Sequence, residues 1–331
     1  MAEVLLSPGV LANENDSSFL QAQPIQAGAA IVGPTVKGPV GIPTLVTTYS
    51  DYQNRFGAVV ESGSAEYTYF TSISAYNYFQ QGGDSLLVTR VVSGSYTSAT
   101  SSIIADSDTS ASIVLETISE GVDQNSTSTL GSSGELASGS AENVRWEIVS
   151  PNTSSGTFSL LIRRGNDITT SKTILETWTN MSLDPNASNY IEKVIGNSKQ
   201  NVTSDAGEYY IQNSGSYNTI SRYVRVKSVA TKTLNYFDNA GTAKNAYTSS
   251  IPTAASGTFG AASGTPFVGM EALFYENISN TNTQGFDSAA LGDTTSTGTY
   301  TVALNLLANQ DLFRYNLITV PGLINANAIA T

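Results

Sequence analysis

The chain of 331 residues contains neither cysteine nor histidine. The lack of cysteine excludes a disulfide-stapled secreted scaffold and every thiolate-based metal or redox site. The lack of histidine removes the side chain most used as a general base near neutral pH, and also the commonest zinc ligand. Enzyme mechanisms that depend on a cysteine or a histidine are therefore excluded for this chain.

The chain also has little charge, and most of that charge is negative. Only 13% of the residues are charged, with 27 Asp and Glu against 15 Lys and Arg, which gives a net charge of -12. Nucleic-acid binding depends on clustered Lys and Arg that displace counterions from phosphates, so we expect no nucleic acid as a partner. The surface of a soluble domain is usually about 25 to 35% charged. Either part of this surface contacts other subunits, or Ser, Thr and Asn supply the polar surface instead.

Long hydrophobic runs are missing as well. A membrane-spanning helix needs about 20 predominantly apolar residues, and no stretch of the sequence approaches that length. At the N-terminus, Glu3 lies where a signal peptide carries Lys or Arg, and Ser7 and Pro8 interrupt the apolar run. We therefore expect neither membrane insertion nor export.

Residues 1–24 contain too little apolar material to pack against a core. A short apolar run is followed by Pro8-Gly9 and a polar stretch, and such a segment is ordered only by another chain. It is either an ordinary frayed terminus or an arm that adds a strand to the sheet edge of a neighbouring subunit. In the second case the inter-subunit contacts would be made by the apolar residues Val4, Leu5, Leu6, Val10 and Leu11.

Residues 25–92 carry the local signals of an α/β unit. Short buried strands are predicted at 29–32, 44–47 and 86–92. The prolines between the first two strands lack backbone N–H donors, so this connection must run as turns or along a sheet edge. Helices between strands then indicate a layered architecture, in which each helix covers the sheet.

Two helices are predicted in this unit. Ser50 and Gln53 fit a capping box for a short helix that Gly57 ends. The next helix is predicted to begin after Ser64 as its N-cap and to stop at Gly82-Gly83. Its apolar residues recur at spacings of four and three, which predicts one aromatic face packed on the sheet, formed by Tyr69, Ile73, Tyr76 and Phe79.

Residues 93–300 are rich in Ser, Thr and Gly and indicate a different kind of structure. One helix is predicted, with Asp184-Pro185 as its start and Gly196 as its end. Otherwise the patterns favour strands, at 113–115, 144–148, 157–162, 173–178, 208–211, 222–229 and 267–274. We therefore predict a mostly β inserted domain.

The α/β pattern returns in residues 301–331, with a helix from about Thr301 and a compact strand at 317–320 that ends at Pro321-Gly322. The sequence thus predicts a mixed α+β fold. An N-terminal arm (1–24) precedes a discontinuous α/β core domain (25–92 and 301–331), which the inserted β-rich domain (93–300) interrupts.

The candidate motifs for nucleotide, calcium or catalytic sites are incomplete. The segment Gly28 to Gly38 is rich in glycine, but it lacks the endings of a P-loop or dinucleotide motif, and its proline would disrupt a cradle of N–H donors. Asp106 and Asp108 lack the Gly and the closing Glu of a calcium loop. A polysaccharide hydrolase would need a pair of carboxylates that no motif identifies. We expect no catalytic, metal or cofactor site.

Basic residues concentrate at few places in this acidic chain. Val224 and Val226 alternate with cations, which predicts a strand with one apolar face and one cationic face. Such a face is either simply solvated, where each exposed pair contributes only about 0 to 1 kcal/mol, or it meets an acidic patch on the next subunit. The residues of this candidate inter-subunit charged face are Arg222, Arg225 and Lys227, joined by Arg163 and Arg164.

Three stretches together resemble the tail sheath proteins of contractile bacteriophages (myoviruses), in the N-terminal portion of that family. They are Leu6-Ser7-Pro8-Gly9-Val10 with the later Gly-Pro pairs, the helix-to-strand element from Tyr78 to Val91, and Leu317 to Gly322. The middle stretches 158–164, 176–178 and 183–196 are similar to a domain inserted in many sheath proteins. Each motif alone is weak, but their order and spacing are jointly more specific.

The resemblance implies a structural protein and no enzyme. Subunits would stack helically as hexameric rings around a rigid tube, held by arms that add strands to neighbours, and would contract to drive the tube through the host envelope. The implied partners are other copies of the chain, the tail tube protein, and baseplate and tail terminator proteins. The implied location is the virion tail sheath, assembled in the host cytoplasm. Sheath proteins continue beyond the Pro-Gly element, so the second part of the core is expected to be incomplete at Thr331.

The main alternative is an acidic, β-rich surface-layer or adhesin-type structural protein. That class would explain the Ser/Thr-rich middle of the chain. It would not explain the helices predicted at 50–82 and 303–311.

Overall fold

Strands from near the two ends of the described chain pair in one sheet. The computed structural model describes residues 24–62, 65–104, 111–122, 129–136, 141–265 and 298–323, and its fold is mixed α+β. The core sheet has the order β15-β1-β5-β2. Strand β1 (Ile25–Gly33) lies parallel to both β15 (Phe313–Thr319) and β5 (Leu86–Arg90), while β2 (Thr44–Val46) pairs antiparallel with β5 at one edge. The predicted return of the chain to its first α/β unit is confirmed.

Both faces of the core sheet are covered, which is why β1 and β5 are nearly continuous apolar runs. One face packs against α1 (Tyr49–Phe56) and α2 (Phe70–Gln80) through Ala29, Ile31, Leu86 and Val88. The other face packs against α5 (Tyr300–Leu307) through Ala30, Val32 and Leu87. Successive side chains of a strand point to opposite faces, so this alternation follows directly from the pairing register.

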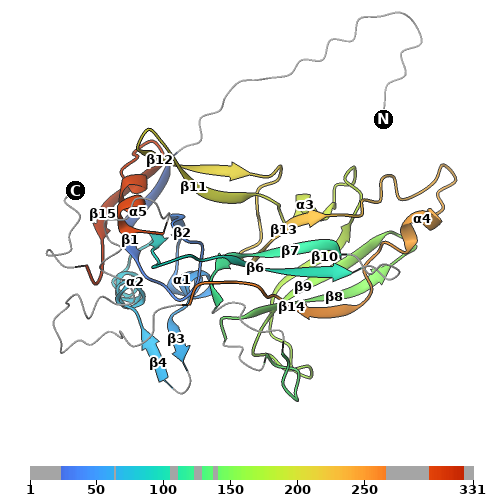
Figure 1. Cartoon of the computed structure of the whole chain (residues 1–331), viewed down its shortest axis with the longest axis horizontal. Coiled ribbons are helices and arrows are strands. Elements are labelled where there is room, and N and C mark those ends of the chain that lie inside the picture. The colour runs from blue at the N-terminus through green and yellow to red at the C-terminus, as the bar shows by residue number, and fades with distance from the viewer. Residues whose placement is uncertain are drawn as a thin grey trace, which may run out of the picture.

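A hairpin from the middle of the chain also packs on this core. Strands β11 (Lys199–Asp205) and β12 (Glu208–Ser214) pair antiparallel. Val202 is buried in the same cluster as α5, and Tyr209 and Ile211 pack against that cluster. In Figure 1 the hairpin lies next to α5, away from the other strands of the middle region. The middle of the chain therefore covers part of the core sheet's helix layer, which the sequence did not predict.

The larger β body consists of two sheets that pack around a common apolar core (Figure 1). One sheet has the order β10-β9-β8-β14 and the other β13-β7-β6, with antiparallel pairing throughout. Trp146, on the inward face of its strand, donates from Nε1 to Ser101 Oγ of the facing sheet at 2.7 Å. The strands are β6 (Ser98–Ile104), β7 (Ala111–Glu120), β8 (Val144–Asn152), β9 (Thr157–Arg164), β10 (Ile174–Ser182), β13 (Val224–Val229) and β14 (Ala255–Thr258).

Several local predictions were wrong in their boundaries. The first helix begins two residues earlier than expected, because Thr48 and not Ser50 is its N-cap and accepts from the N–H of Asp51. The helix predicted from Asp184 is only the single turn α3 (Ile191–Val194), because Asp184 Oδ1 instead accepts from Asn186 N in a local turn. The last strand begins at Phe313, four residues before the predicted start.

The second helix also differs from its prediction. The residues after Ser64 form a strand, β4 (Ala65–Thr68), in a hairpin with β3 (Val59–Ser62), and α2 begins only at Phe70. Its buried side chains are Thr71, Ser72 and Ala75, whereas Tyr76 is 44% exposed. The predicted aromatic face is therefore only partly the face that meets the sheet, since Tyr76 is exposed while Phe79 packs against the cluster of sheet residues. The small residues allow the closer approach, since a Cβ at Gly33 of β1 would lie 2.3 Å from Thr71 Oγ1.

Some predictions fall outside the described residues: the arm at 1–23, the acidic pair Asp106 and Asp108, and the strand at 267–274. The remaining short helix, α4 (Asn245–Thr248), lies at the end of the β body farthest from the core sheet (Figure 1). No helix among the described residues is long and apolar enough to cross a membrane.

Candidate functional site: the junction pocket

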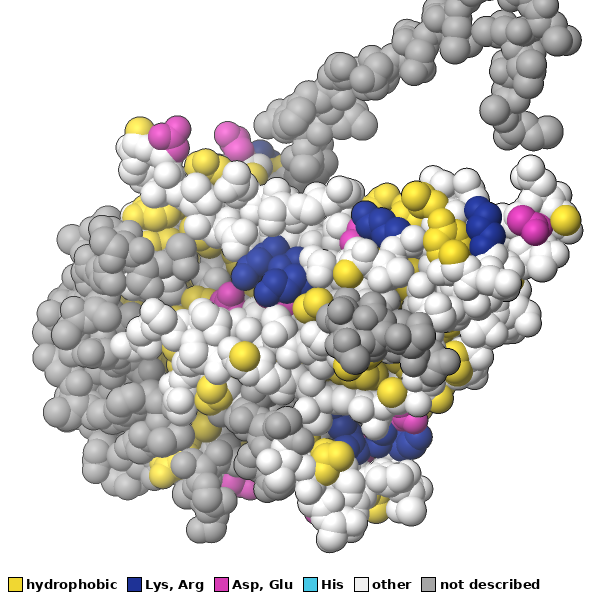
Figure 2. All heavy atoms as spheres, turned by 45° about the vertical axis from the view of Figure 1, so that its right-hand side comes forward, with side chains coloured by type: hydrophobic (Ala, Val, Ile, Leu, Met, Phe, Trp, Pro, Cys, Tyr) yellow, Lys and Arg dark blue, Asp and Glu magenta, His cyan; other side chains and the backbone are white. Residues whose placement is uncertain are grey.

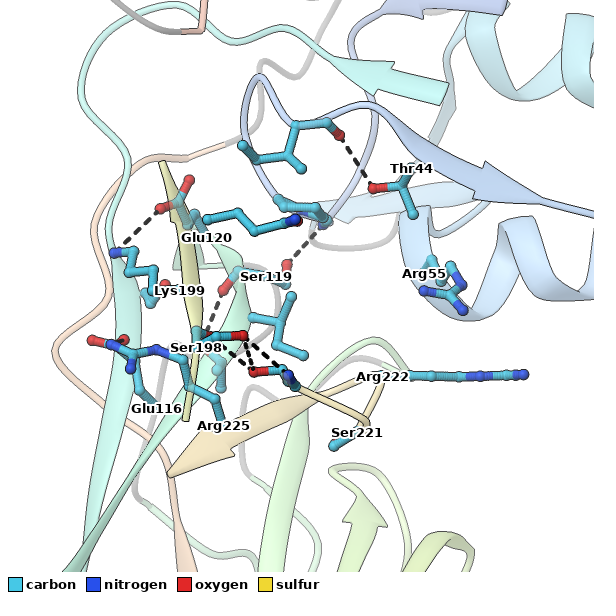
Figure 3. Close-up of a pocket in the computed structure, with 18 of the residues that line it drawn as sticks. Thr44, Arg55, Glu116, Ser119, Glu120, Ser198, Lys199, Ser221, Arg222 and Arg225 are labelled. Carbon is cyan, nitrogen blue, oxygen red and sulfur yellow. Dashed lines mark hydrogen bonds and ion pairs between the residues drawn. The ribbon is translucent and has the colours of Figure 1, made fainter. Parts of the chain in front are cut away.

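A pocket of about 400 Å³ lies where the core sheet's loops meet the β body. We call it the junction pocket. Its walls are the loop 38–44, the end of α1, the end of β7, the start of β11, and the segment 218–225 that leads into β13 (Figure 3). Two of the predicted cationic residues, Arg222 and Arg225, line it, together with Lys199 and Arg55. The structure thus gathers several of the few cations of the chain around one cavity.

Arg90 anchors one side of this junction. It ends the buried strand β5, its residue is only 1% exposed, and its guanidinium lies 5.1 Å from the centre of the Tyr96 ring. The group donates to three backbone carbonyl oxygens, those of Glu120 (2.7 Å), Gly38 (2.8 Å) and Val36 (3.3 Å). A buried charge needs such partners, because an unpaired one costs several kcal/mol or more. Arg90 therefore ties the loop after β1 to the end of β7.

Backbone and side-chain bonds complete this tie. Gly38 N donates to Ser119 Oγ at 2.8 Å, and Val40 N donates to the carboxylate of Glu120 at 3.3 Å. Beside the pocket, the buried Lys37 of the core pairs with Glu142 of the β body. The two bodies thus meet through polar groups that are satisfied by specific partners.

Two carboxylates at the junction pocket have pKa values shifted in opposite directions. Burial alone would raise the pKa of Glu116, but the charge of Arg225, hydrogen bonds from Lys227 and Arg225, and the charge of Lys199 hold it below its ordinary value of 4.5. Burial raises the pKa of Glu120 above 4.5, and the charge of Lys199 opposes this only in part. Lys199 Nζ lies 4.0 Å from Glu120 Oε1 (Figure 3).

Strand β13 has the predicted apolar and cationic faces, but its cationic side chains form ion pairs within the chain. Val224 and Val226 are buried as expected. Arg225 pairs with Glu116, and the half-exposed Lys227 lies 3.1 Å from the same carboxylate. Arg222, whose side chain is 51% exposed, extends toward the α1 side of the pocket and lies 3.3 Å from Asp51 (Figure 3).

Arg163 and Arg164 do not join that face. Both are on β9, in the other sheet. Arg163 is 4% exposed and makes a bidentate pair with Asp167, with two N–O distances of 2.9 Å. Arg145 also donates to Asp167, and Arg163 reaches Glu147 at 2.9 Å. Arg163 therefore holds together the interior of the β body, and Arg164 lines a separate pocket beside Lys37.

Figure 2 shows the distribution of charge on one side of the molecule. In the described part of that surface, charged side chains are few, and the Lys and Arg side chains form separate groups. This pattern agrees with the low charge content of the sequence.

The charged groups of the junction pocket are paired largely with one another. Its carboxylates are engaged by Arg225, Lys227, Lys199 and a backbone N–H. In the described ranges, no group of three or more Asp or Glu side chains is close enough to hold a metal ion. The sequence analysis missed Arg90, Glu120 and Asp167. A charged residue inside an apolar run, as in Leu86 to Val92, is a signal of a buried and partnered group that could have identified Arg90.

Comparison with known proteins gives limited resemblances. No protein-family model matches the chain, and no curated protein matches its sequence. Among solved structures, it is similar to a sheath tail protein from Listeria innocua, with 11% identity and a TM-score of 0.33 over 73% of this chain and 36% of that one. It is also similar to a sheath tail protein from Desulfitobacterium hafniense, with 11% identity and a TM-score of 0.25 over 67% of this chain and 39% of that one. The chain thus spans less than two fifths of the length of either protein.

Proposed function

We propose that this protein is a structural subunit of a contractile tail sheath, which polymerises as helically stacked hexameric rings around a tail tube. The observation that carries the proposal is the parallel pairing of β1 with β15, in which Ile25 lies beside Phe313. One core sheet is thereby built from both ends of the chain, and the β body grows out of it. This is the arrangement expected from the sequence motifs that resemble sheath proteins. The partners would be other copies of the chain, a tube protein, and baseplate and terminator proteins.

The open edge of the core sheet supports assembly by strand addition. Strand β15 is at the edge of the sheet order, and among the described residues it pairs only with β1. It exposes Leu317 and Ile318. Exposed edge strands with apolar side chains are templates for pairing with another chain, which solitary proteins usually avoid. We propose that the segment 1–24 of a neighbouring subunit, with Val4 to Leu6 and Val10-Leu11, adds to such an edge.

The exposed cations supply a second proposed contact. Arg222 and Lys227 have side chains that are 51% and 46% exposed, so they remain accessible to an acidic patch of a neighbouring copy. Arg163 is excluded from this role because it is buried. The proposal keeps the predicted division into an arm, a discontinuous core domain and an inserted domain. The hairpin β11–β12 belongs to the inserted region but packs on the core.

Electron microscopy of the purified protein at rising concentration tests the proposal. We expect helical tubes or stacked rings, and we expect a variant lacking residues 1–24 to stay folded but not to polymerise. Flat lattices would instead favour the surface-layer alternative. Dispersed monomers at all concentrations, or normal polymers from the truncated variant, would contradict the sheath proposal and the role of the arm, respectively.

A further inference from the structure

A second pocket, of about 420 Å³, lies in the β body. We call it the distal pocket. It is formed by the start of β9, the end of β10 with the loop that follows, and the loop 235–237. The last of these loops leads into α4, which marks the end of the molecule opposite the core sheet (Figure 1). This pocket shares no lining residue with the junction pocket.

An aromatic platform forms one wall of the distal pocket. Tyr236 is 4% exposed, donates from its hydroxyl to Thr153 O at 2.5 Å, and stacks on Tyr247 with ring centres 6.4 Å apart. Its ring lies so close to Gly156 that a Cβ there would be 2.7 Å away. Phe237 meets the Tyr236 ring edge-on at 5.3 Å and is itself 43% exposed. A fixed aromatic residue thus supports an accessible one, so the accessible ring loses little freedom when a ligand covers it.

The loop that carries this platform is held by its own hydrogen bonds. Asp238 Oδ1 accepts from the N–H groups of Ala240 and Thr242, both at 2.8 Å. Phe237 pairs with Ala243 across the loop. The shape of this wall is therefore formed before any ligand arrives.

Polar groups with unused hydrogen-bonding capacity also line the distal pocket. Asp184 is 9% exposed, and its Oδ1 accepts from Asn186 N at 3.0 Å. Asn189 uses its Nδ2 to donate to Asn180 O at 2.6 Å, and Asn235 uses its Oδ1 to accept from Asn186. Within the described part of the chain, Asp184 Oδ2, Asn189 Oδ1 and Asn235 Nδ2 have no hydrogen-bond partner. Two acceptors and one donor therefore remain for a ligand.

The chemistry of the lining selects the class of ligand. No Lys or Arg lines the distal pocket, so an anion would meet only Asp184. A purely apolar ligand would leave the free oxygen of the buried Asp184 carboxylate without a hydrogen-bond partner, which is unfavourable. A pyranose ring has an apolar C–H face and hydroxyls that both donate and accept. We propose that the distal pocket binds a neutral saccharide, with its apolar face on Phe237 and its hydroxyls on Asp184, Asn189 and Asn235.

Titration with neutral disaccharides, followed by NMR or calorimetry, tests this site. The probes are maltose, cellobiose, mannobiose and N,N′-diacetylchitobiose, each up to about 10 mM, which covers the weak affinities expected of a small ligand. We expect at least one to bind. Phe237→Ala should then weaken binding by about tenfold or more, because the apolar face of the saccharide loses the phenyl ring that it packs against. Asp184→Asn should weaken binding of the same saccharide, because the variant places an amide N–H₂ where a hydroxyl of the saccharide needs a hydrogen-bond acceptor.

The matched control is Leu234→Ala. Leu234 is apolar and 49% exposed, close to the 43% of Phe237, and it belongs to the same loop region without lining the pocket. We expect this variant to bind the saccharide as the wild type does. The proposal is overturned if none of the four saccharides binds, if binding survives both Phe237→Ala and Asp184→Asn, or if the pocket takes only a cationic probe such as lysine amide. All measurements use the unassembled protein, so a failure here leaves the sheath proposal untouched.

Discussion

At the residue scale, Glu116 and Glu120 show how neighbouring side chains decide the protonation of two similar groups on one strand. Glu116 faces Arg225 and Lys227, so its pKa is lowered although burial alone would raise it. Glu120 is held by one backbone N–H and a more distant Lys199, so burial prevails and its pKa is raised. Both groups line the same junction pocket. They therefore oppose each other in the pH dependence of stability.

The sign follows from proton linkage. A lowered native pKa means that Glu116 contributes stability above its ordinary value of 4.5, and that this contribution is lost as the pH falls through the native pKa. A raised native pKa means that Glu120 costs stability as the pH rises from 4.5 through its native pKa. We expect Glu116→Gln to be less stable than the wild type at neutral pH, with a difference that closes in acid. We expect Glu120→Gln to gain on the wild type as the pH rises.

Urea unfolding midpoints of the three proteins between about pH 3 and pH 8 measure both trends. The two variants are matched, since each replaces one glutamate of β7 by its neutral isostere. If both variants followed the same pH trend relative to the wild type, the opposite electrostatic environments would be wrong.

The residue scale is also where the sequence revealed least. It grouped Arg222 with Arg225 and Lys227, of which only the last two alternate with valines along β13, while Arg222 lies two residues before that strand. It could not assign Glu116 as the partner of Arg225, because that pairing depends on the register between β13 and β7. It placed Arg163 in the same face, because the sequence does not indicate to which sheet a basic residue belongs. Side-chain partners distant in sequence follow from tertiary register, which local patterns do not contain.

At the element scale, helix α2 shows why a regular apolar spacing can predict the wrong face. Tyr69, Ile73, Tyr76 and Phe79 have helical spacing, yet within the helix the buried residues are Thr71, Ser72 and Ala75. Of the predicted four, only the N-cap residue Tyr69 is buried. The helix approaches β1 closely, so small side chains fit there, and Tyr52 Oη lies 3.1 Å from Ser72 Oγ across the α1–α2 contact. Tyr76 instead packs edge-on against Tyr49, at 5.0 Å between ring centres. By contrast, the existence of β1 and β5 was predicted, since a fully buried strand is a short apolar run bounded by turn residues, although β1 begins at Ile25, four residues before its predicted start.

This packing predicts that substitutions at two neighbouring residues of α2 lower the free energy of unfolding by different amounts. Ala75 has no exposed surface, so Ala75→Leu should overpack the contact and lower the free energy of unfolding by about 1 to 3 kcal/mol. Tyr76 is 44% exposed, so Tyr76→Ser should cost less, about 1 kcal/mol or below. Urea unfolding of both variants at one pH gives the comparison. A larger loss for Tyr76→Ser would show that the aromatic face is the buried one after all.

At the scale of the whole molecule, the parallel pairing of β1 with β15 joins the two ends of the described chain. Among the described residues, no strand pairs with the other side of β15. The sequence predicted this long-range closure because both segments carry the same helix-and-strand pattern. It did not predict that the hairpin β11–β12 returns to cover α5, since its strands are short and polar on one side like those of the β body. Which surface a half-apolar hairpin covers is decided by tertiary packing alone.

The open edge of β15 gives the last prediction. Leu317 is 62% exposed, so Leu317→Lys should change the stability of the monomer by no more than about 0.5 kcal/mol. A lysine on an edge strand opposes pairing with another chain, because its charge would have to be buried or displaced in the shared sheet. We therefore expect this variant to shift association, measured by sedimentation velocity at rising protein concentration, to markedly higher concentrations. Ile220→Lys is the matched control, since Ile220 is also 62% exposed but lies outside the named strands. Equal association of the two variants would remove β15 from the proposed assembly surface.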